Sequence, residues 1–394
     1  MLDIQQQGII TLVRNAILGE KNSVSQDFKL SDAVAVARKH QIINILYYGA
    51  LQAGLPQDET MQQLFMLSCM ALSKSEQQMF EINRICTAFN ERGIEYMPLK
   101  GTLLKYFYPK ADMRAMGDAD ILIKPRQYDL IKPILTELGF TEKLESDHEL
   151  TWAKPALYLE LHKRVIPSYN KDYYEYFGDG WRLARPCEEQ PNRYEMSAED
   201  ALIYLFTHFA KHYRDGGIGI RHMTDLWIYR RVKSELDETY IKKELKKLQL
   251  WEFYKNVMDT LQVWFGSAEP TDKTDFITGV IFGSGAYGTH EAHITASAVK
   301  LIKTAGSTAG ARRKKVLNVL FPKCKNMAKR YPVLEKAPVL LPVFWVVRGA
   351  ETLLFSSRKL KDQKADMQIL TDENISDFQK ALDYVGLDFN FKED

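Results

Sequence analysis

The sequence has few of the features that mark secreted, zinc-finger or membrane-spanning proteins. Its four cysteines lie far apart and form no Cys-x-x-Cys pair, so we expect neither a disulfide framework nor a zinc site. No uncharged apolar run reaches the ~18–20 residues that cross a bilayer. The N-terminal sequence MLDIQQQG carries an early acid and no apolar signal core. These absences favour a protein of the reducing cytoplasm.

The chain also lacks a strong net charge. Its formal charge is +2, with 26% charged and 45% hydrophobic residues, which is the balance of an ordinary globular protein. A charge this small disfavours a protein that binds long nucleic acids. The 394 residues exceed the size at which single cores stop growing, about 250–300 residues, so we expect two or three domains.

One stretch carries most of the chemical information. Residues 97–123, MPLKGTLLKYFYPKADMRAMGDADILI, place Asp118 and Asp120 at the start of an apolar run that predicts a buried strand. Residues two apart share one face of a strand, so both carboxylates point the same way. They repel each other unless a cation lies between them, and Mg²⁺ (or Mn²⁺) prefers such oxygen ligands. Alone, an Asp-x-Asp pair is also typical of a solvated strand edge or a helix cap.

A later strand supplies a third acid. In ALYLELHKRV, residues 156–165, Tyr158, Glu160 and His162 alternate with three leucines, which predicts a second strand with one apolar face. We expect Glu160 to join Asp118 and Asp120 as the catalytic and metal-binding residues. The three acids together are a more specific signal than the aspartate pair alone.

These motifs resemble the polymerase-β-type nucleotidyltransferase superfamily. Its pattern is an apolar residue, Gly and a small hydroxyl residue or Gly, then a helix, an Asp-x-Asp strand and a third acid on a later strand. More narrowly, PLKGTLLKYFYP, MRAMGDADILI, ELGF and LELH, within residues 94–165, resemble a bacterial group of poorly characterised nucleotidyltransferases. The resemblance implies two-metal transfer of a nucleoside monophosphate from an NTP such as ATP. Thr102 stands where the superfamily more often has Ser or Gly.

Further residues are expected to bind the nucleotide: Lys100, Gly101, Thr102, Arg114, His162, His208 and Asp225. The first three follow a predicted strand and begin a predicted helix, whose N-terminus suits a triphosphate. For Arg114 two roles stay open, a contact with phosphate and a bridge to a nearby acid. His208 and Asp225 come from the resemblance, which continues weakly through THFAKH and the helix that carries Asp225.

We expect an α+β fold, in which a small mixed β-sheet forms a nucleotidyltransferase core flanked by N-terminal helices and a large C-terminal helical region. The predicted domains are 1–93, a helical region packing on the core, 94–196, the catalytic core, and 197–394, a helical domain. Asp58 begins a long helical pattern that Gly93 ends. Residues 166–196 predict an aromatic, loop-rich connection.

Nothing in the sequence identifies the acceptor, which could be a sugar phosphate, a small metabolite, an RNA end or a protein. Residues 312–330 contain eight basic residues and no acid, and the uncharged residues 338–347 follow. The segment 312–348 could contact an anionic membrane peripherally. A solvated helix face before a core helix is the favoured interpretation. The alternative to an enzyme is a catalytically inactive nucleotide-binding protein or a membrane-peripheral scaffold.

Overall fold

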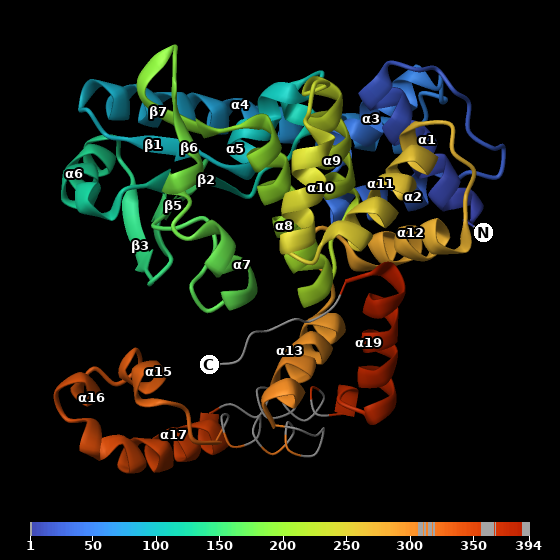
Figure 1. Cartoon of the computed structure of the whole chain (residues 1–394). Coiled ribbons are helices and arrows are strands. Elements are labelled where there is room, and N and C mark those ends of the chain that lie inside the picture. Colours follow the sequence, from blue (N-terminus) through green and yellow to red (C-terminus); the bar gives the residue numbers. More distant parts are fainter. Residues whose placement is uncertain are drawn as a thin grey trace. The chain divides into compact units, whose positions relative to one another are not determined.

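The computed structural model in Figure 1 describes residues 2–305, 320–355 and 368–387, together with residues 310, 313, 317 and 366. The chain forms two compact units. The first holds Met1–Lys211 and Ile218–Tyr287, and the second holds the described residues of His212–Gly217 and Gly288–Phe389. The division predicted at residues 93 and 196 stays a prediction.

The first unit begins with four helices: α1 (Ile4–Leu18), α2 (Leu30–His40), α3 (Ile43–Gln52) and α4 (Glu59–Glu91). As predicted, α4 starts after Asp58, whose carboxylate accepts a hydrogen bond from the Met61 N–H at 2.9 Å. A cap of this kind satisfies one of the N–H groups that lack partners at a helix start.

The first unit also contains a mixed sheet of seven strands, in the order β3-β4-β5-β2-β1-β7-β6. The strands are β1 (Tyr96–Pro98), β2 (Asp118–Ile123), β3 (Thr141–Glu145), β4 (Glu149–Ala153), β5 (Tyr158–His162), β6 (Ala184–Cys187) and β7 (Gln190–Met196). β2 pairs with β5, and β1 with β7, in parallel, whereas the other neighbours are antiparallel. The α+β fold class is confirmed.

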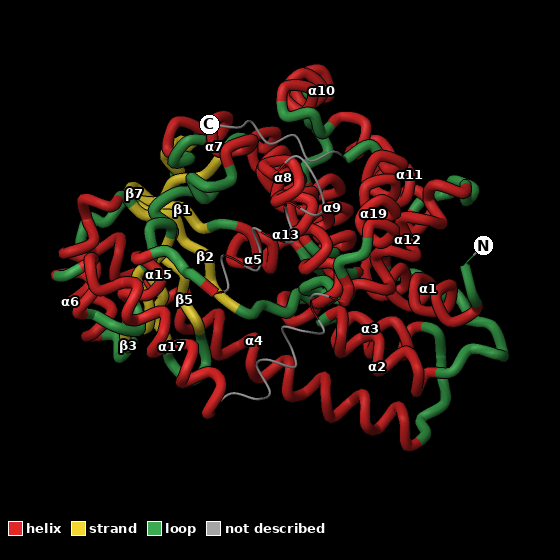
Figure 2. Tube along the Cα trace, turned by 90° about the horizontal axis from the view of Figure 1, so that it is seen from below, coloured by secondary structure: helices red, strands yellow, loops and turns green. Residues whose placement is uncertain are grey.

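Apolar residues of the sheet and of two helices form a core on one face of the sheet. α4 contributes Ile82, Ile85 and Phe89, and α6 (Tyr128–Glu137) contributes Ile131, Ile134 and Leu135. The inward residues of β2 and β5 are Ala119, Ile121, Ile123, Leu159 and Leu161. Because side chains alternate along a strand, Asp118, Asp120 and Glu160 must point to the opposite face. Figure 1 shows α4 running across the sheet and Figure 2 shows the same elements from below.

Three strands differ from the sequence interpretation. Residues 166–196 were expected to be loop-rich, but β6 and β7 form a hairpin there, and β7 pairs with β1. β3 lies in a stretch that predicts no strand. β3 and β6 are the outermost strands of the sheet, and neither strand has a fully buried residue. Edge strands of this kind bury little and so need no apolar run.

The remaining helices of the first unit are α5 (Lys100–Leu104), η1 (Lys105–Phe107), η2 (Ala111–Met113), η3 (Pro125–Gln127), α7 (Lys171–Phe177), η4 (Trp181–Leu183), α9 (Ile220–Val232), α10 (Glu238–Lys247), α11 (Trp251–Phe265) and α12 (Asp272–Ser284). α8 (Ala198–Asp215) begins in the first unit and ends in the second. The prediction that the chain is mainly helical after the sheet is confirmed.

The second unit contains α13 (His290–Ala305), α15 (Cys324–Ala328), α16 (Val333–Lys336), η5 (Pro338–Leu340), α17 (Leu341–Phe355) and α19 (Asp372–Val385). Among the described residues, no helix is both long and apolar enough to span a bilayer. Most of residues 312–319 in the basic segment lie outside the described residues. Membrane contact through 312–348 therefore stays a prediction.

Candidate active site

Neighbouring parallel strands bring two of the predicted acids together. In the register of β2 and β5, Asp120 lies beside Glu160, and Asp118 lies two residues earlier on the same face. Oxygen atoms of Asp120 and Glu160 and a ring nitrogen of His162 all lie within 4.8 Å of one another. Asp120 is only 4% exposed, whereas Asp118 and Glu160 are half-buried. The arrangement concentrates negative charge on the face of the sheet that lacks the core.

This crowding changes the protonation of the acids. Burial raises the pKa of Glu160 to about 8, and the negative charges of Asp118, Asp120 and Glu149 add to the rise. Burial would also raise the pKa of Asp120, but the Lys100 charge and a hydrogen bond from His162 hold that pKa well below its usual range. At neutral pH the protein alone thus holds Asp120 ionised and leaves Glu160 largely protonated.

Lys100 supplies the positive charge beside Asp120. Its Nζ donates to Asp120 Oδ1 at 2.8 Å, and this ion pair is largely buried. The backbone of Lys100 has a φ of +45°, the left-handed conformation that non-glycine residues rarely adopt. Such a conformation costs on the order of 1–3 kcal/mol and persists only where its surroundings hold it. A contact between Lys100 and a triphosphate stays a prediction.

Thr102 and Gly101 belong to α5, the short helix that follows β1 and packs beside β2. The Thr102 hydroxyl accepts a hydrogen bond from the Asp120 N–H at 3.1 Å, so it fixes the backbone that carries the acid. A Cβ atom at Gly101 would lie 3.1 Å from Nη1 of Arg114, which is tighter than most real contacts. The Thr102 hydroxyl therefore ties α5 to β2, and the absence of a side chain at Gly101 leaves room for the Arg114 guanidinium. A contact of either residue with phosphate stays a prediction.

Replacing Thr102 by valine should weaken folding. Valine keeps the shape of the side chain but removes the acceptor, and a buried donor left unpaired costs about 1–3 kcal/mol. Thr102→Ser keeps the hydroxyl and should lose only the burial of one methyl group, about 0.8 kcal/mol. Urea denaturation measures the free energy of unfolding of each variant. A serine variant as unstable as the valine variant would contradict this role of the hydroxyl.

Arg114 forms a buried ion pair with Asp225 of α9. Its Nε and Nη2 donate to Oδ1 and Oδ2 of Asp225, both at 2.9 Å, and Tyr108 donates to Oδ1 at 2.7 Å. Of the two roles predicted for Arg114, the structure contains the bridge to an acid. Contacts of Arg114 and Asp225 with the nucleotide stay predictions. The pair joins the loop before β2 to the helical part of the first unit.

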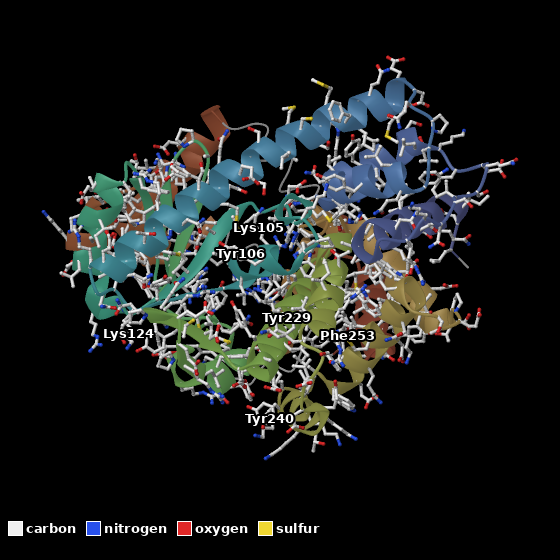
Figure 3. All side chains as sticks on the ribbon, turned by 90° about the horizontal axis from the view of Figure 1, so that it is seen from above. Lys105, Tyr106, Lys124, Tyr229, Tyr240 and Phe253 are labelled. Carbon is white, nitrogen blue, oxygen red and sulfur yellow. The ribbon has the colours of Figure 1, made fainter. Side chains whose placement is uncertain are left out.

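Lys105 lies next to this loop and is almost fully buried. Its Nζ donates to Ser75 Oγ of α4 at 2.8 Å and to the Arg114 carbonyl at 2.9 Å. Figure 3 labels Lys105 close to α4. Burial, together with the nearby charge of Arg114, lowers the pKa of Lys105 from 10.5 to about 8.

The stability of the protein should therefore rise between pH 8 and pH 10.5 through Lys105. In this range the unfolded chain still binds the proton that the folded chain has released, so raising the pH favours folding. Below pH 8, the folded and the unfolded chain both bind the proton. The burial of the charged Lys105 amine then destabilises the folded state by its full amount, on the order of 3 kcal/mol.

Urea denaturation of the wild type and of Lys105→Met tests this effect. Between about pH 7.5 and about pH 9.5, the wild type should gain on the order of 2 kcal/mol relative to the variant. The exposed Lys110, replaced by methionine, is the control and should keep the wild-type pH dependence. Parallel pH profiles for the wild type and Lys105→Met would contradict the shifted pKa.

Sequence reasoning missed Tyr204, His148 and Glu149. Tyr204 is 2% exposed, and its hydroxyl has no hydrogen-bond partner among the described residues. Burial raises the pKa of Tyr204 to about 12, the charge of Lys100 opposes the rise, and that of Asp120 adds to it, so the hydroxyl lies near both. Tyr204 precedes the half-buried His208 by four residues on α8, a spacing that the sequence contained.

A pocket of about 210 Å³ opens beside Lys100. Residues of β1, α5, β6, β7, α8 and α9, together with Lys233 after α9, line it. They combine aromatic rings with positive charge: Lys100, Arg185, Arg193, Tyr204, Tyr229 and Lys233. Drug-sized ligands occupy clefts of about 300–1,000 Å³, so this pocket suits one part of a substrate pair.

His148 and Glu149 stand at the start of β4, opposite His162. Glu149 is the direct cross-strand partner of His162, and the rings of His148 and His162 are 5.0 Å apart. Burial lowers the pKa of His148 to about 3, and the charges of His162 and Lys100 contribute to the shift, so this ring is neutral at physiological pH. The sequence around His148 and Glu149 contains no motif comparable to the Asp-x-Asp strand that indicated Asp118 and Asp120.

The chain belongs to a nucleotidyltransferase family. The model of a family described as "uncharacterised nucleotidyltransferase" matches residues 26–266, more than half of the chain. The resemblance inferred from the motifs is thus confirmed at the level of the superfamily. The family assignment makes the protein an enzyme of the nucleotidyltransferase class, with a nucleotide as substrate.

Two other comparisons add little. Among curated proteins, none matches the chain. Among solved structures, the chain is similar to the antibiotic-resistance factor ANT(2'')-Ia, studied in solution, with 12% identity and a TM-score of 0.33. That match covers 48% of this chain and 97% of the other. A similarity at this TM-score supports no conclusion about the substrate.

Proposed function

We propose that the protein transfers a nucleoside monophosphate from an NTP to a hydroxyl or phosphate acceptor, by the two-metal route of polymerase-β-type enzymes. The observation that carries this proposal is the placement of Asp118, Asp120 and Glu160 on one face of two adjacent parallel strands. Three acids at one place need a compensating cation, and the family assignment supplies the reaction class.

The donor set fits Mg²⁺ or Mn²⁺. Carboxylate oxygens are the ligands that these hard cations prefer, and Lys100 is the cation that the chain itself places against Asp120. Asp118, Asp120 and Glu160 would hold the metal. When bound, it would stabilise charge on the phosphates and on the leaving pyrophosphate.

The chain's own residues then have defined roles in the transfer. The acceptor oxygen forms a bond to the α-phosphorus, and the bond from that phosphorus to the pyrophosphate oxygen breaks. The acceptor proton goes to the Glu160 carboxylate, which the positive charge of a bound cation would keep ionised. Lys100 keeps Asp120 ionised, because its charge lowers the pKa of that carboxyl. The pocket beside Lys100 takes the nucleobase or the acceptor, where Tyr204 and Tyr229 offer aromatic surface.

A thermal-shift screen of the four NTPs, with and without Mg²⁺ or Mn²⁺, tests the proposal. One nucleotide should raise the melting temperature only when the metal is present, because a ligand at 100 times its Kd stabilises the folded state by about 2.7 kcal/mol. Pyrophosphate release with that nucleotide and a panel of acceptors then measures transfer. A folded protein that binds none of the four NTPs with either metal would contradict the proposal.

A further inference from the structure

A second group of potential metal ligands lies beside the acidic site. Glu149 Oε2 is 3.8 Å from His162 Nδ1 and 3.9 Å from His148 Nε2. One ligand atom from each of these three residues lies within 4.8 Å of the other two. The group combines two imidazoles with one carboxylate, whereas the site of Asp118, Asp120 and Glu160 is made of carboxylates.

The contact with Asp120 determines which ring nitrogen of His162 is left for a metal ion. His162 Nε2 lies 2.7 Å from Asp120 Oδ1, and an ionised carboxylate can only accept, so Nε2 carries the hydrogen. In a neutral imidazole the other nitrogen, Nδ1, then has a free lone pair. This atom is buried, its side chain is 3% exposed, and it has no hydrogen-bond partner among the described residues.

The distances around Nδ1 favour a cation over a direct hydrogen bond. The 3.8 Å between Nδ1 and Glu149 Oε2 is too long for a hydrogen bond. A metal between them, at about 2.0–2.2 Å from each, would bridge such a gap. Without a bound cation, the buried lone pair of His162 Nδ1 would face the Glu149 carboxylate and would have no hydrogen-bond donor to pair with.

The backbone around these ligands is fixed. Ser146 Oγ accepts hydrogen bonds from the N–H groups of His148 and Glu149, at 3.2 and 3.0 Å. The Lys163 N–H donates to the His148 carbonyl at 2.8 Å. The bend before β4 therefore places the His148 ring beside the ring of His162, although successive residues of a regular strand would point to opposite faces.

We propose that His148, Glu149 and His162 bind one divalent transition-metal ion of borderline softness, such as Zn²⁺. Two imidazoles and a carboxylate are a set that suits such ions better than Mg²⁺. Asp120 accepts the Nε2–H of His162 from the other side, which is the usual arrangement of a carboxylate behind a metal-binding histidine. His162 would thus connect this ion to the acidic site.

The inference goes beyond the proposed transfer reaction and does not depend on it. The metal-free full-length protein is titrated with Co²⁺ in excess Mg²⁺, which competes with Co²⁺ for all-oxygen sites. The visible absorption of Co²⁺ and isothermal calorimetry report the ligands and the affinity. The wild type should bind one Co²⁺ with a spectrum of mixed nitrogen and oxygen ligation.

Substitutions of single residues test which side chains bind the metal ion. His148→Gln and Glu149→Gln should each lower the Co²⁺ affinity by at least about 10²-fold, because a ligand is lost, and Asp120→Asn should lower it by about 10–100-fold. Glu145→Gln, on the neighbouring strand, and His290→Gln, an exposed histidine, are controls and should bind as the wild type does. Circular dichroism checks that each variant is folded.

Two results would overturn the site. One is an unchanged affinity and spectrum in both His148→Gln and Glu149→Gln. The other, which needs no variant, is a wild-type spectrum that shows oxygen ligands alone. Asp118→Asn separates this inference from the transfer reaction, because it lies outside the three ligands and should retain the Co²⁺ spectrum even though transfer is lost.

Discussion

Asp118→Asn should abolish nucleotidyl transfer while the fold remains intact. The Asp118 side chain is half-buried and has no hydrogen bond or ion pair with any described residue, so its removal leaves no partner unsatisfied. Asparagine keeps the shape but removes a negative charge from the proposed metal site. We expect transfer to fall by at least about 10³-fold, which corresponds to ~4 kcal/mol of barrier, and the free energy of unfolding to change by less than about 0.5 kcal/mol.

Pyrophosphate release, with the nucleotide and acceptor found by the screen, measures this loss. Asp129→Asn, at an exposed position of α6, is the matched control and should keep wild-type turnover. Asp120→Asn should lose activity as well, but it should also destabilise the protein, since Lys100 would lose its buried ionic partner. Wild-type turnover in Asp118→Asn would contradict the proposed site.

Breaking the Arg114–Asp225 pair should have the largest effect on stability. Arg114→Met leaves the Asp225 charge buried without its partner, and Asp225→Asn does the same to Arg114. Removal of one member of a buried ion pair typically costs about 3–5 kcal/mol. We expect each single variant to lose an amount in this range in urea denaturation.

The double variant separates the stabilisation by the ion pair from the cost of burying each charge alone. Arg114→Met with Asp225→Asn removes both charges and should lose less than the sum of the two single variants. The control is Arg126→Met, since Arg126 pairs with Glu95 but is 73% exposed, and exposed pairs contribute about 0–1 kcal/mol. Single-variant losses below about 1 kcal/mol, or strictly additive losses, would show that the pair does not stabilise the fold.

The parts of the fold that the sequence predicts are those with strong apolar patterns. α4 has a cap at Asp58 and buries one face, β2 begins with Asp-Ala-Asp before an apolar run, and β5 alternates leucines with Tyr158, Glu160 and His162. If β2 and β5 are neighbouring strands, these patterns place Asp120 and Glu160 on the same face of the sheet. β3 and β6 lack such a pattern because they form the edges of the sheet, and their residues are largely exposed.

From the sequence, the candidate site could be predicted only where acidic residues stand within apolar strands. Asp118, Asp120 and Glu160 stand out because acids within apolar strands need a reason. The partner of Arg114 was not predictable, since Asp225 is 111 residues away and both an acid and a phosphate would satisfy a guanidinium. The hydrogen bond from the Asp120 N–H to the Thr102 hydroxyl was not predictable either, and a contact of Thr102 with phosphate stays a prediction. Such choices depend on atomic distances that a sequence pattern does not contain.

The left-handed backbone of Lys100 and the ion pair of its side chain make opposite contributions to stability. Glycine would adopt a φ of +45° without strain, which would recover on the order of 1–3 kcal/mol. Glycine would also leave the Asp120 charge buried without its partner, which typically costs about 3–5 kcal/mol. A library at position 100 should therefore retain lysine whether it is sorted for thermal resistance or for turnover, since the cation that keeps Asp120 ionised also outweighs the strain of its own backbone.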